Sequence, residues 1–272
     1  MNTIEFTKLV AAGNDFILID NARKKVESKV GSLSKLAKLV CARRRSIGAD
    51  GLLVLEGSRR ADVAMRIFNP DGSEPEMCGN GSRCLAYYVA HRGITGNNLS
   101  IETEAGILKA VVRKDMVKVG ITEPKDLRLD IVLHSASEEM NLAFVNTGVP
   151  HAVHIVKNLG AVDVKKIGRQ VRYHKIFAPE GANVDFIKIH GARAISMRTY
   201  ERGVEGETFA CGTGAVASAI IASELKNVRP PVKVRTFGGE VLRIYFKKKD
   251  KRYRDVYLEG AVKLVFDGTL KV

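Results

Sequence analysis

The sequence Cys78-Gly79-Asn80-Gly81-Ser82 recurs half a molecule later as Cys211-Gly212-Thr213-Gly214-Ala215. Each copy follows a strand-like segment, Met65–Asn69 in the first half and Met197–Glu201 in the second. The spacing between strand and cysteine differs by a single residue between the two copies. This internal repeat predicts two pseudo-symmetric lobes, each built on a strand, a glycine-rich loop and a helix.

Alternating polar and apolar residues predict many short, half-buried strands. The clearest strands are expected at 61–68, 106–113, 116–121, 127–133, 194–200 and 240–246. Amphipathic periodicity predicts helices at 33–44, capped by Ser32, and at 163–173. Two more helices are expected behind the cysteine loops, at 81–91 and 214–225. The fold class predicted is therefore α/β (α+β).

The helix expected after Cys211 contains the segment Ala215–Ala222, which is apolar nearly all round. A helix of this kind is buried on every side, so we expect it to run through the middle of a strongly curved sheet. Pro124 lies in a turn-like stretch near the middle of the chain. We place the boundary between the lobes there, with residues 1–124 in the first and 125–259 in the second.

Composition is typical of a globular protein, with 45% hydrophobic and 27% charged residues in 272. Four cysteines in a chain of this length indicate reduced thiols rather than a disulfide framework. The start of the sequence lacks the features of a signal peptide, and no apolar run is long enough to cross a membrane. We therefore expect a cytoplasmic protein without a membrane partner.

The net charge of +14 is concentrated in runs such as Arg43–Arg45 and Lys247–Lys249. A nucleic-acid partner is one interpretation, but an aromatic content of 6%, no Trp and no recognisable binding motif speak against it. The alternatives are a solvated basic surface rich in ion pairs, or a field that attracts a substrate bearing carboxylates.

The two cysteine loops suggest a specific chemistry. The first N–H groups of a helix favour a bound carboxylate, glycines allow it to come close, and a cysteine there is expected to have its pKa lowered below about 8.5. Two such loops facing each other could hold one carboxylate and place a sulfur on each face of the neighbouring carbon. One thiolate would remove the α-hydrogen and the opposite thiol would return a proton, without a cofactor. The alternative for either loop is a small residue packed in a tight turn, and Cys41 and Cys84 are predicted to be core residues.

Other polar residues are weaker candidates. His151 and His154 are three apart in a strand-like segment and would point to opposite faces, so a shared metal site is not expected. His151 alone is either a site residue or a structural one. Asn14 and Asn183 lie in similar short segments, and the neighbours Glu201 and Arg202 could bind an ammonium and a carboxylate.

The segments Phe68–Ser73 and Met77–Gly81, followed by Tyr200–Gly203 and Ala210–Gly214, resemble the diaminopimelate epimerase family. The segments Gly13–Phe16 and Gly148–His151 also fit it, so the resemblance spans almost the whole chain. It implies interconversion of LL- and meso-2,6-diaminopimelate without pyridoxal phosphate, other cofactor or metal, in lysine and peptidoglycan synthesis. It also implies curved, barrel-like, mostly antiparallel sheets around central helices, an active site between the lobes, a strand at 260–272 returning to the first lobe, and a homodimer.

Carried over by position, the resemblance makes Cys78 and Cys211 the acid–base pair. It implies that the reacting carboxylate is held by Gly79, Asn80, Gly212 and Thr213. The amino groups and distal carboxylate would be held by Asn14, Asn69, Asn183, Glu201 and Arg202. His151 and Glu201 would tune the thiols or the reacting amine.

Two positions depart from the family pattern. Val149 stands where many members have asparagine, and Gly51 stands where some have glutamine. Both concern recognition of the distal end. The Val149 departure leaves a related racemase of another amino acid as one alternative. The basic charge leaves a nucleic-acid-binding protein as an alternative of another class.

Overall fold

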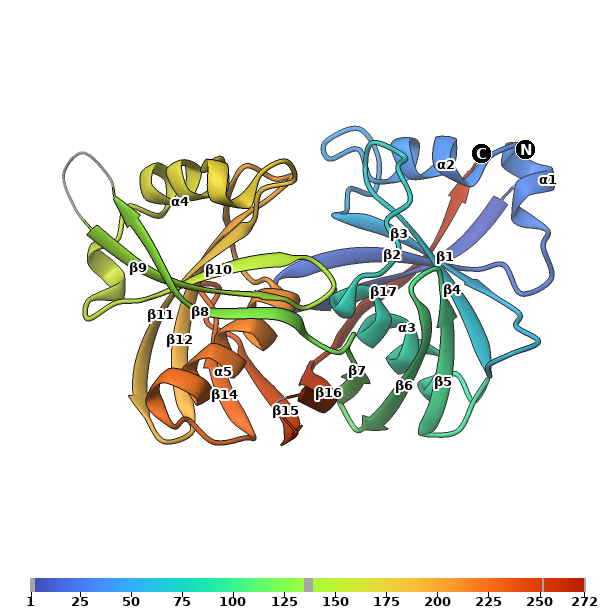
Figure 1. The fold of residues 1–272 in the computed structure, drawn as a ribbon. Helices are drawn as coiled ribbons and strands as arrows, with labels where there is room; N and C mark the ends of the chain where they lie inside the picture. Colours follow the sequence, from blue (N-terminus) through green and yellow to red (C-terminus); the bar gives the residue numbers. More distant parts are fainter. Residues whose placement is uncertain (1–2, 135–138, 251, 272) are drawn as a thin grey trace. The chain divides into compact units, whose positions relative to one another are not determined.

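The computed structural model describes residues 3–134, 139–250 and 252–271, with the side chain of His134 outside the description (Figure 1). By its internal contacts the chain divides into two compact units. The N-terminal unit comprises residues 1–119 and 260–272, and the C-terminal unit comprises residues 120–259. The boundary expected at Pro124 stays a prediction.

The sheet of the N-terminal unit begins with a strand from the far end of the sequence. Its order is β17 (Lys263–Lys271), β1 (Thr3–Ala11), β2 (Asn14–Asp20), β3 (Gly51–Glu56), β4 (Val63–Phe68), β5 (Asn98–Thr103), β6 (Gly106–Arg113) and β7 (Met116–Gly120). The pairs β2–β3 and β4–β5 are parallel, and the other neighbours are antiparallel.

The C-terminal unit repeats this succession of pairings. Its order is β8 (Lys125–His134), β9 (Glu139–Asn146), β10 (Pro150–Ile155), β11 (Asn183–Gly191), β12 (Ala194–Glu201), β14 (Val232–Arg235), β15 (Val241–Lys249) and β16 (Arg252–Ala261), with β13 (Gly206–Thr208) beside β12. Here β10–β11 and β12–β14 are the parallel pairs. Strand β17 thus takes the edge position in its unit that β8 takes in the other.

One central helix lies against each sheet. Helix α3 (Gly79–His91) contacts β1 to β6, and helix α5 (Gly212–Lys226) contacts β9 to β12, β14 and β15 (Figure 1). The segment Ala215–Ala222 is fully buried, as its apolar composition predicts. The α+β fold class with curved sheets around central helices is confirmed, and among the described strands no pairing closes either sheet into a full barrel.

A second set of helices covers the opposite face of each sheet. Helix α2 (Leu33–Val40), beside the short α1 (Val26–Val30), packs on Leu52 and Val54 of β3, whose neighbours Leu53 and Leu55 point the other way. Helix α4 (Val164–Arg172) packs on Val184 and Phe186 of β11 in the same manner. The short 3-10 turns η1 (Leu159–Ala161) and η2 (Lys175–Phe177) flank α4.

The helix ends show where local periodicity succeeds and where it fails. Ser32 and Asp163 cap α2 and α4 through their side chains, and the Ser32 cap is confirmed. The helix predicted at 33–44 ends at Val40 instead, because the chain turns after Cys41 and Arg44 adopts a left-handed φ of 69°. Helices α3 and α5 each begin two residues earlier than predicted, directly after their cysteines.

Gly168 allows α4 to lie close to β12. A Cβ at this position would come within 2.4 Å of the Cβ of Tyr200, which has no freedom to move aside. We expect overpacking in Gly168→Ala to cost about 1–3 kcal/mol, against roughly 1 kcal/mol gained in helix propensity, so the variant should be less stable by up to about 2 kcal/mol. Thermal unfolding should show a lowered midpoint. Gly160→Ala is the control, because its Cβ would meet only Asn158 at 3.6 Å, and an equal loss in both variants would refute the steric argument.

Candidate active site

The two repeated cysteines occupy equivalent places in the two units. Cys78 is the N-cap of α3 with φ −141° and ψ 114°, and Cys211 is the N-cap of α5 with φ −123° and ψ 115°. Each cysteine carbonyl accepts the first helical hydrogen bond, at 2.8 Å from Ser82 and 2.9 Å from Ala215. Each sulfur therefore stands at the positive end of a helix, where N–H groups of the first turn are available to an anion.

Around Cys78 the side chains form a hydrogen-bond chain with a fixed direction. The half-buried Cys78 sulfur accepts from the Gly81 N–H at 3.5 Å. The Asn80 side-chain oxygen accepts from the guanidinium of Arg83, a fully buried side chain one turn along α3. Because a guanidinium only donates, the Asn80 amide nitrogen must face Asn14, to whose oxygen it donates at 2.7 Å.

The hydrogen-bond chain continues from Asn14 to charged residues. Asn14 donates to Asp50 at 3.1 Å, and Asp50 binds Arg43 at 2.7 Å. Arg43 also binds Asp15, which in turn contacts Lys8 at 2.7 Å. Burial raises the pKa of Asp15, but hydrogen bonds from Arg43 and Lys8 outweigh it and lower the pKa to about 2.

This ion-pair network predicts an acid-dependent contribution to stability. A carboxyl with a lowered pKa stabilises the fold above its unfolded value of 3.8, and the contribution is lost as the pH falls through about 2. We expect Asp15→Asn to cost about 1 kcal/mol at neutral pH, a value reduced by the solvent exposure of Arg43. The difference in unfolding midpoint between variant and parent should vanish below about pH 2, and a pH-independent difference would exclude this origin.

Around Cys211 the environment is buried and different in kind. The Cys211 sulfur lies 3.4 Å from the hydroxyl of Thr213, and that hydroxyl lies 3.0 Å from Nε2 of His151. His151 Nδ1 is 2.7 Å from Asp185, whose second oxygen accepts from the Thr199 hydroxyl at 2.6 Å. His151 and Asp185 are both 0% exposed.

The acidity of Cys211 differs from the expectation based on sequence. Burial raises the pKa of this thiol well above its usual range, and the charges of Glu201 and Asp185 add to the effect. The hydrogen bonds from Thr213 and the Gly214 N–H lower it by less. The predicted lowering is therefore wrong for Cys211, because desolvation of the thiolate exceeds the effect of the helix end.

The remaining predicted residues of the C-terminal unit lie around the ends of β11 and β12. Asn183 accepts from the backbone N–H of Arg202 at 2.8 Å and donates to the Pro150 carbonyl at 3.1 Å. The Glu201 carboxylate accepts from Thr208 at 2.7 Å, and Arg202 reaches Glu180 at 3.7 Å. Asn183 and Arg202 are thus brought together.

Asn69 and Gly51 lie next to the Leu52–Phe68 pair, where β3 begins and β4 ends. Asn69 follows β4 in a turn and donates to Ser73 at 2.9 Å. Gly51 begins β3, and a Cβ there would lie 3.2 Å from the Phe68 carbonyl and 3.3 Å from the Phe16 ring. The Phe16 ring therefore takes up the space that a longer side chain at position 51 would need.

Sequence reasoning missed Asp185, Thr199, Arg83 and Asp50. A signal existed for Asp185, which is the one charged residue within the apolar strand segment Val184–Ile187. Arg83 lies on a largely buried helix, and its own side chain is fully buried inside the unit. Cys41 and Cys84 are buried core residues as predicted, and burial raises the pKa of Cys41 to about 11.

The two histidines that are three apart point in different directions. His151 binds Asp185, whereas His154 binds the Asn141 carbonyl at 2.7 Å. Within residues 3–134, 139–250 and 252–271, no cluster of three or more His, Cys, Asp or Glu side chains is placed to bind a metal ion. Over the same residues, the helices are all too short or too polar to cross a membrane.

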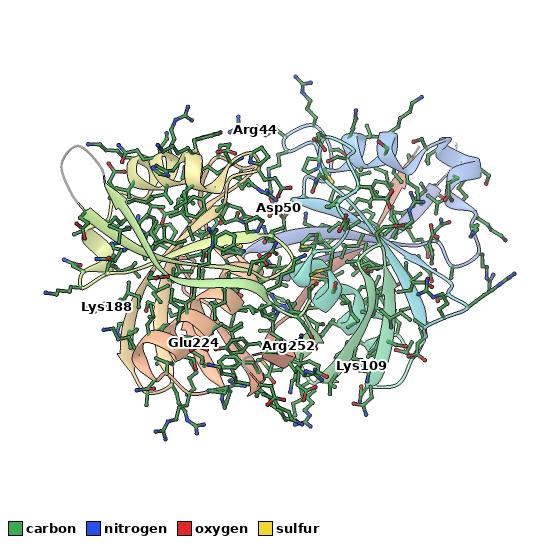
Figure 2. All side chains as sticks on the ribbon, in the orientation of Figure 1. Arg44, Asp50, Lys109, Lys188, Glu224 and Arg252 are labelled. Atoms are coloured by element: carbon green, nitrogen blue, oxygen red, sulfur yellow. The ribbon has the colours of Figure 1, made fainter. Side chains whose placement is uncertain are left out.

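Many basic side chains on the surface pair with carboxylates. Arg66 binds Glu74 at 2.7 Å, Arg198 binds Glu207 at 2.6 Å and Arg243 binds Glu259 at 2.7 Å. Others, such as Lys109 and Arg252, extend from their strands into solvent (Figure 2). The distribution fits a solvated surface with ion pairs.

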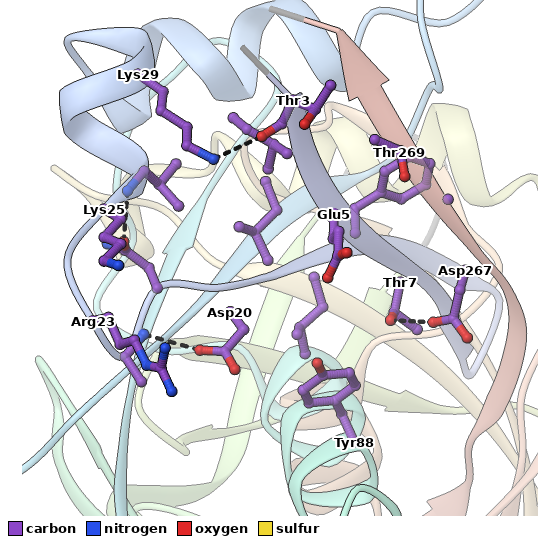
Figure 3. A pocket seen from close by; sticks show the side chains of 18 of the residues that line it. Thr3, Glu5, Thr7, Asp20, Arg23, Lys25, Lys29, Tyr88, Asp267 and Thr269 are labelled. Carbon is purple, nitrogen blue, oxygen red and sulfur yellow. Dashed lines mark hydrogen bonds between the residues drawn. The ribbon is translucent and has the colours of Figure 1, made fainter.

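A cavity of about 890 Å³ lies in the N-terminal unit, away from the cysteine loop. Tyr88, Glu5 and Asp20 line it, together with Asp267, which accepts from Thr7 at 2.6 Å (Figure 3). None of the residues predicted for the reaction lines this cavity.

Comparison with solved structures identifies the same fold in several enzymes. A phenazine biosynthesis protein of the PhzF family from Bacillus anthracis superposes with a TM-score of 0.77 over 100% of both chains, at 19% identity. A hydroxyproline epimerase from Agrobacterium vitis gives 0.70 over 98% of this chain and 92% of that one, at 17% identity. At these identities the likeness concerns the fold alone.

Comparison of sequences finds relatives of much higher identity than these solved structures. The diaminopimelate epimerase from Aquifex aeolicus (strain VF5) is 44% identical, covering 98% of each chain, and the one from Archaeoglobus fulgidus is 42% identical, covering 99% of this chain and 97% of that one. The family model described as diaminopimelate epimerase matches residues 6–126 and 143–265, which include both cysteine loops. The chain therefore belongs to the diaminopimelate epimerase family.

Proposed function

We propose that this chain interconverts LL- and meso-2,6-diaminopimelate by a two-thiol mechanism without a cofactor. The observation that carries the proposal is the placement of Cys78 and Cys211 as N-caps of α3 and α5, two helices that occupy equivalent positions in units of the same topology. A matched pair of this kind suits a reaction that needs one base and one acid.

In the proposed reaction the two loops share one substrate carboxylate. One sulfur, as thiolate, takes the α-proton, and the other, as thiol, gives a proton to the opposite face of the same carbon. Negative charge that develops on the carboxylate is stabilised by N–H groups at Gly79, Asn80, Gly212 and Thr213. Burial favours the thiol form of Cys211. When Cys211 is this thiol, Cys78 is the thiolate that removes the α-proton.

The rest of the substrate would be held by polar side chains near the loops. We assign its amino groups and distal carboxylate to Asn14, Asn69, Asn183, Glu201 and Arg202. The adjacent opposite charges of Glu201 and Arg202 fit an ammonium and a carboxylate. The Arg202 backbone N–H donates to the Asn183 side-chain oxygen at 2.8 Å, which holds Arg202 in place. His151 and Glu201 would tune the thiols.

We also propose that the enzyme works as a homodimer in the cytoplasm. Four cysteines in a chain of 272 residues fit reduced thiols in a reducing compartment. The dimer rests on the family resemblance and is tested by sedimentation of the purified protein. A single species with the mass of one chain would exclude it.

An assay in deuterated water tests the activity directly. Purified protein is given LL-diaminopimelate with a chelator and without any added cofactor. We expect the meso form to accumulate, with one deuterium at the inverted carbon for each turnover. Single-carboxylate amino acids, including proline and hydroxyproline, serve as controls, because turnover of one of these instead of diaminopimelate would identify a different racemase.

A further inference from the structure

The strand register allows residues of the two units to be matched one by one. In the N-terminal unit Phe16 pairs with Gly51, the residue before the Leu52–Phe68 pair. In the C-terminal unit His151 pairs with Asn183, the residue before the Val184–Tyr200 pair. Position 16 therefore corresponds to 151, position 53 to 185, and position 67 to 199.

The first helical turns support the same correspondence. A Cβ on Gly81 of α3 would meet the Leu53 side chain at 2.8 Å and then Ile67 at 3.3 Å. A Cβ on Gly214 of α5 would meet the Asp185 carboxylate at 2.5 Å. The helix that carries Cys211 therefore rests on an ionisable group where the helix that carries Cys78 rests on leucine.

Three apolar residues of one unit are thus replaced by three polar ones in the other. The apolar set is Phe16, Leu53 and Ile67, and the polar set is His151, Asp185 and Thr199. An apolar core is the less costly solution at such a site, because a buried carboxylate must be fully hydrogen-bonded. The N-terminal unit shows that the fold itself does not require the polar set.

The polar set gives the hydrogen bonds to Cys211 a direction. Asp185 is an acceptor at both oxygens, from Thr199 at 2.6 Å and from His151 at 2.7 Å, so His151 Nδ1 carries a proton. In the neutral imidazole Nε2 must then accept, and it accepts from the Thr213 hydroxyl at 3.0 Å. The Thr213 oxygen is left to accept from the Cys211 thiol at 3.4 Å.

This arrangement permits a concerted shift of two protons. As the Cys211 S–H bond breaks, its proton passes to the Thr213 oxygen, while the Thr213 hydroxyl proton passes to Nε2 of His151. The products are a thiolate and an imidazolium, and Thr213 ends as a neutral hydroxyl that donates to the sulfur. No net charge is created, and Asp185 lies 2.7 Å from the new cation.

We propose that Asp185 is a positioning residue that fixes the His151 tautomer and thereby lets Cys211 share its proton with His151 through the Thr213 hydroxyl. The proposal rests on the proposed two-thiol function and deepens it, since it makes the two thiols chemically distinct. Cys211 has a buried proton acceptor, His151, within its own unit. Cys78 instead lies beside the hydrogen-bond chain that contains Asn80. The charged groups that face Cys211 are Glu201 from β12, Asp185 from β11 and His151 from β10.

Alkylation of the two thiols in one molecule tests the proposal. Parent and Asp185→Asn proteins are treated with iodoacetamide from about pH 6 to about pH 10, and modification of each cysteine is followed by peptide mass spectrometry. Without the carboxylate the imidazolium is not stabilised, so Cys211 should react about tenfold more slowly at a given pH, with its profile displaced to higher pH. The Cys78 profile should be unchanged, which makes it an internal control for folding.

Two further variants separate the role of the relay from a structural one. Thr213→Val keeps the shape of the side chain and removes the relaying hydroxyl, so it should displace the Cys211 profile in the same direction. Thr199→Val keeps the carboxylate and should cause a smaller displacement. Cys211 profiles in Asp185→Asn and Thr213→Val that match the parent would overturn the proposal.

The alkylation experiment needs no substrate. If the parent fails to epimerise diaminopimelate, the proposed function falls, while alkylation still reports whether Asp185 acts on Cys211. If the parent is active, Asp185→Asn should lower kcat/KM by a similar factor in both directions, because the equilibrium constant is fixed. Its pH profile should move with that of Cys211 alkylation.

Discussion

Cys211→Ala is expected to lower the rate of diaminopimelate epimerisation by at least about 10³-fold, because one of the two protons in the reaction then has no donor or acceptor. The Cys211 side chain is small and sits at the N-cap of α5, so the fold should tolerate alanine. The measurement is meso-diaminopimelate formed from the LL form, followed over at least three decades of rate. Cys78→Ala should have an effect of the same order.

Cys84→Ala is the matched control for this pair. Cys84 lies on the same helix as Cys78 but is a fully buried core residue. Its replacement should cost stability and leave kcat within about twofold. Full activity in Cys78→Ala or Cys211→Ala would refute the two-thiol mechanism, and equal losses in all three variants would indicate a packing effect instead.

Oxidation is expected to abolish activity completely and reversibly. If both sulfurs approach one carbon in the working enzyme, they can close into a disulfide when the site is empty. We expect mass spectrometry of air-exposed protein to show a peptide joining Cys78 to Cys211, and a thiol reductant to restore activity.

The other two cysteines, Cys41 and Cys84, are internal controls for this prediction. Cys41 and Cys84 are buried in the core of the N-terminal unit and should stay reduced under the same conditions. Diaminopimelate bound before oxidation should protect the pair. Inactive oxidised protein without the Cys78–Cys211 link would argue against the proximity that the mechanism needs.

The sequence was informative wherever a local pattern decides the outcome. The apolar segment Ala215–Ala222 predicted a buried central helix, and α5 is one. Alternation predicted β6 with its correct ends, because a half-buried strand needs only a period of two. Local patterns could not show that β17 pairs with β1, since that pairing joins distant parts of the chain.

The candidate site was predictable in its residue types and less so in its energetics. The repeat of two Cys-Gly loops predicted a cysteine loop at the N-terminus of each central helix, although both helices begin two residues earlier than predicted. It could not show that Cys211 itself is buried, and burial decides the direction of that thiol's pKa. Asp185 was missed because pattern reading treats a charged residue in a strand as exposed, whereas here Thr199 and His151 satisfy it inside the unit.

The position of β17 has a consequence for synthesis of the chain. The edge of β1 that pairs with residues 263–271 lacks its neighbour until the whole of the C-terminal unit has left the ribosome. During that interval a row of unpaired backbone groups on β1 is open to strands of other nascent chains. The N-terminal half of the chain therefore carries an aggregation-prone strand edge while the other half is still being translated.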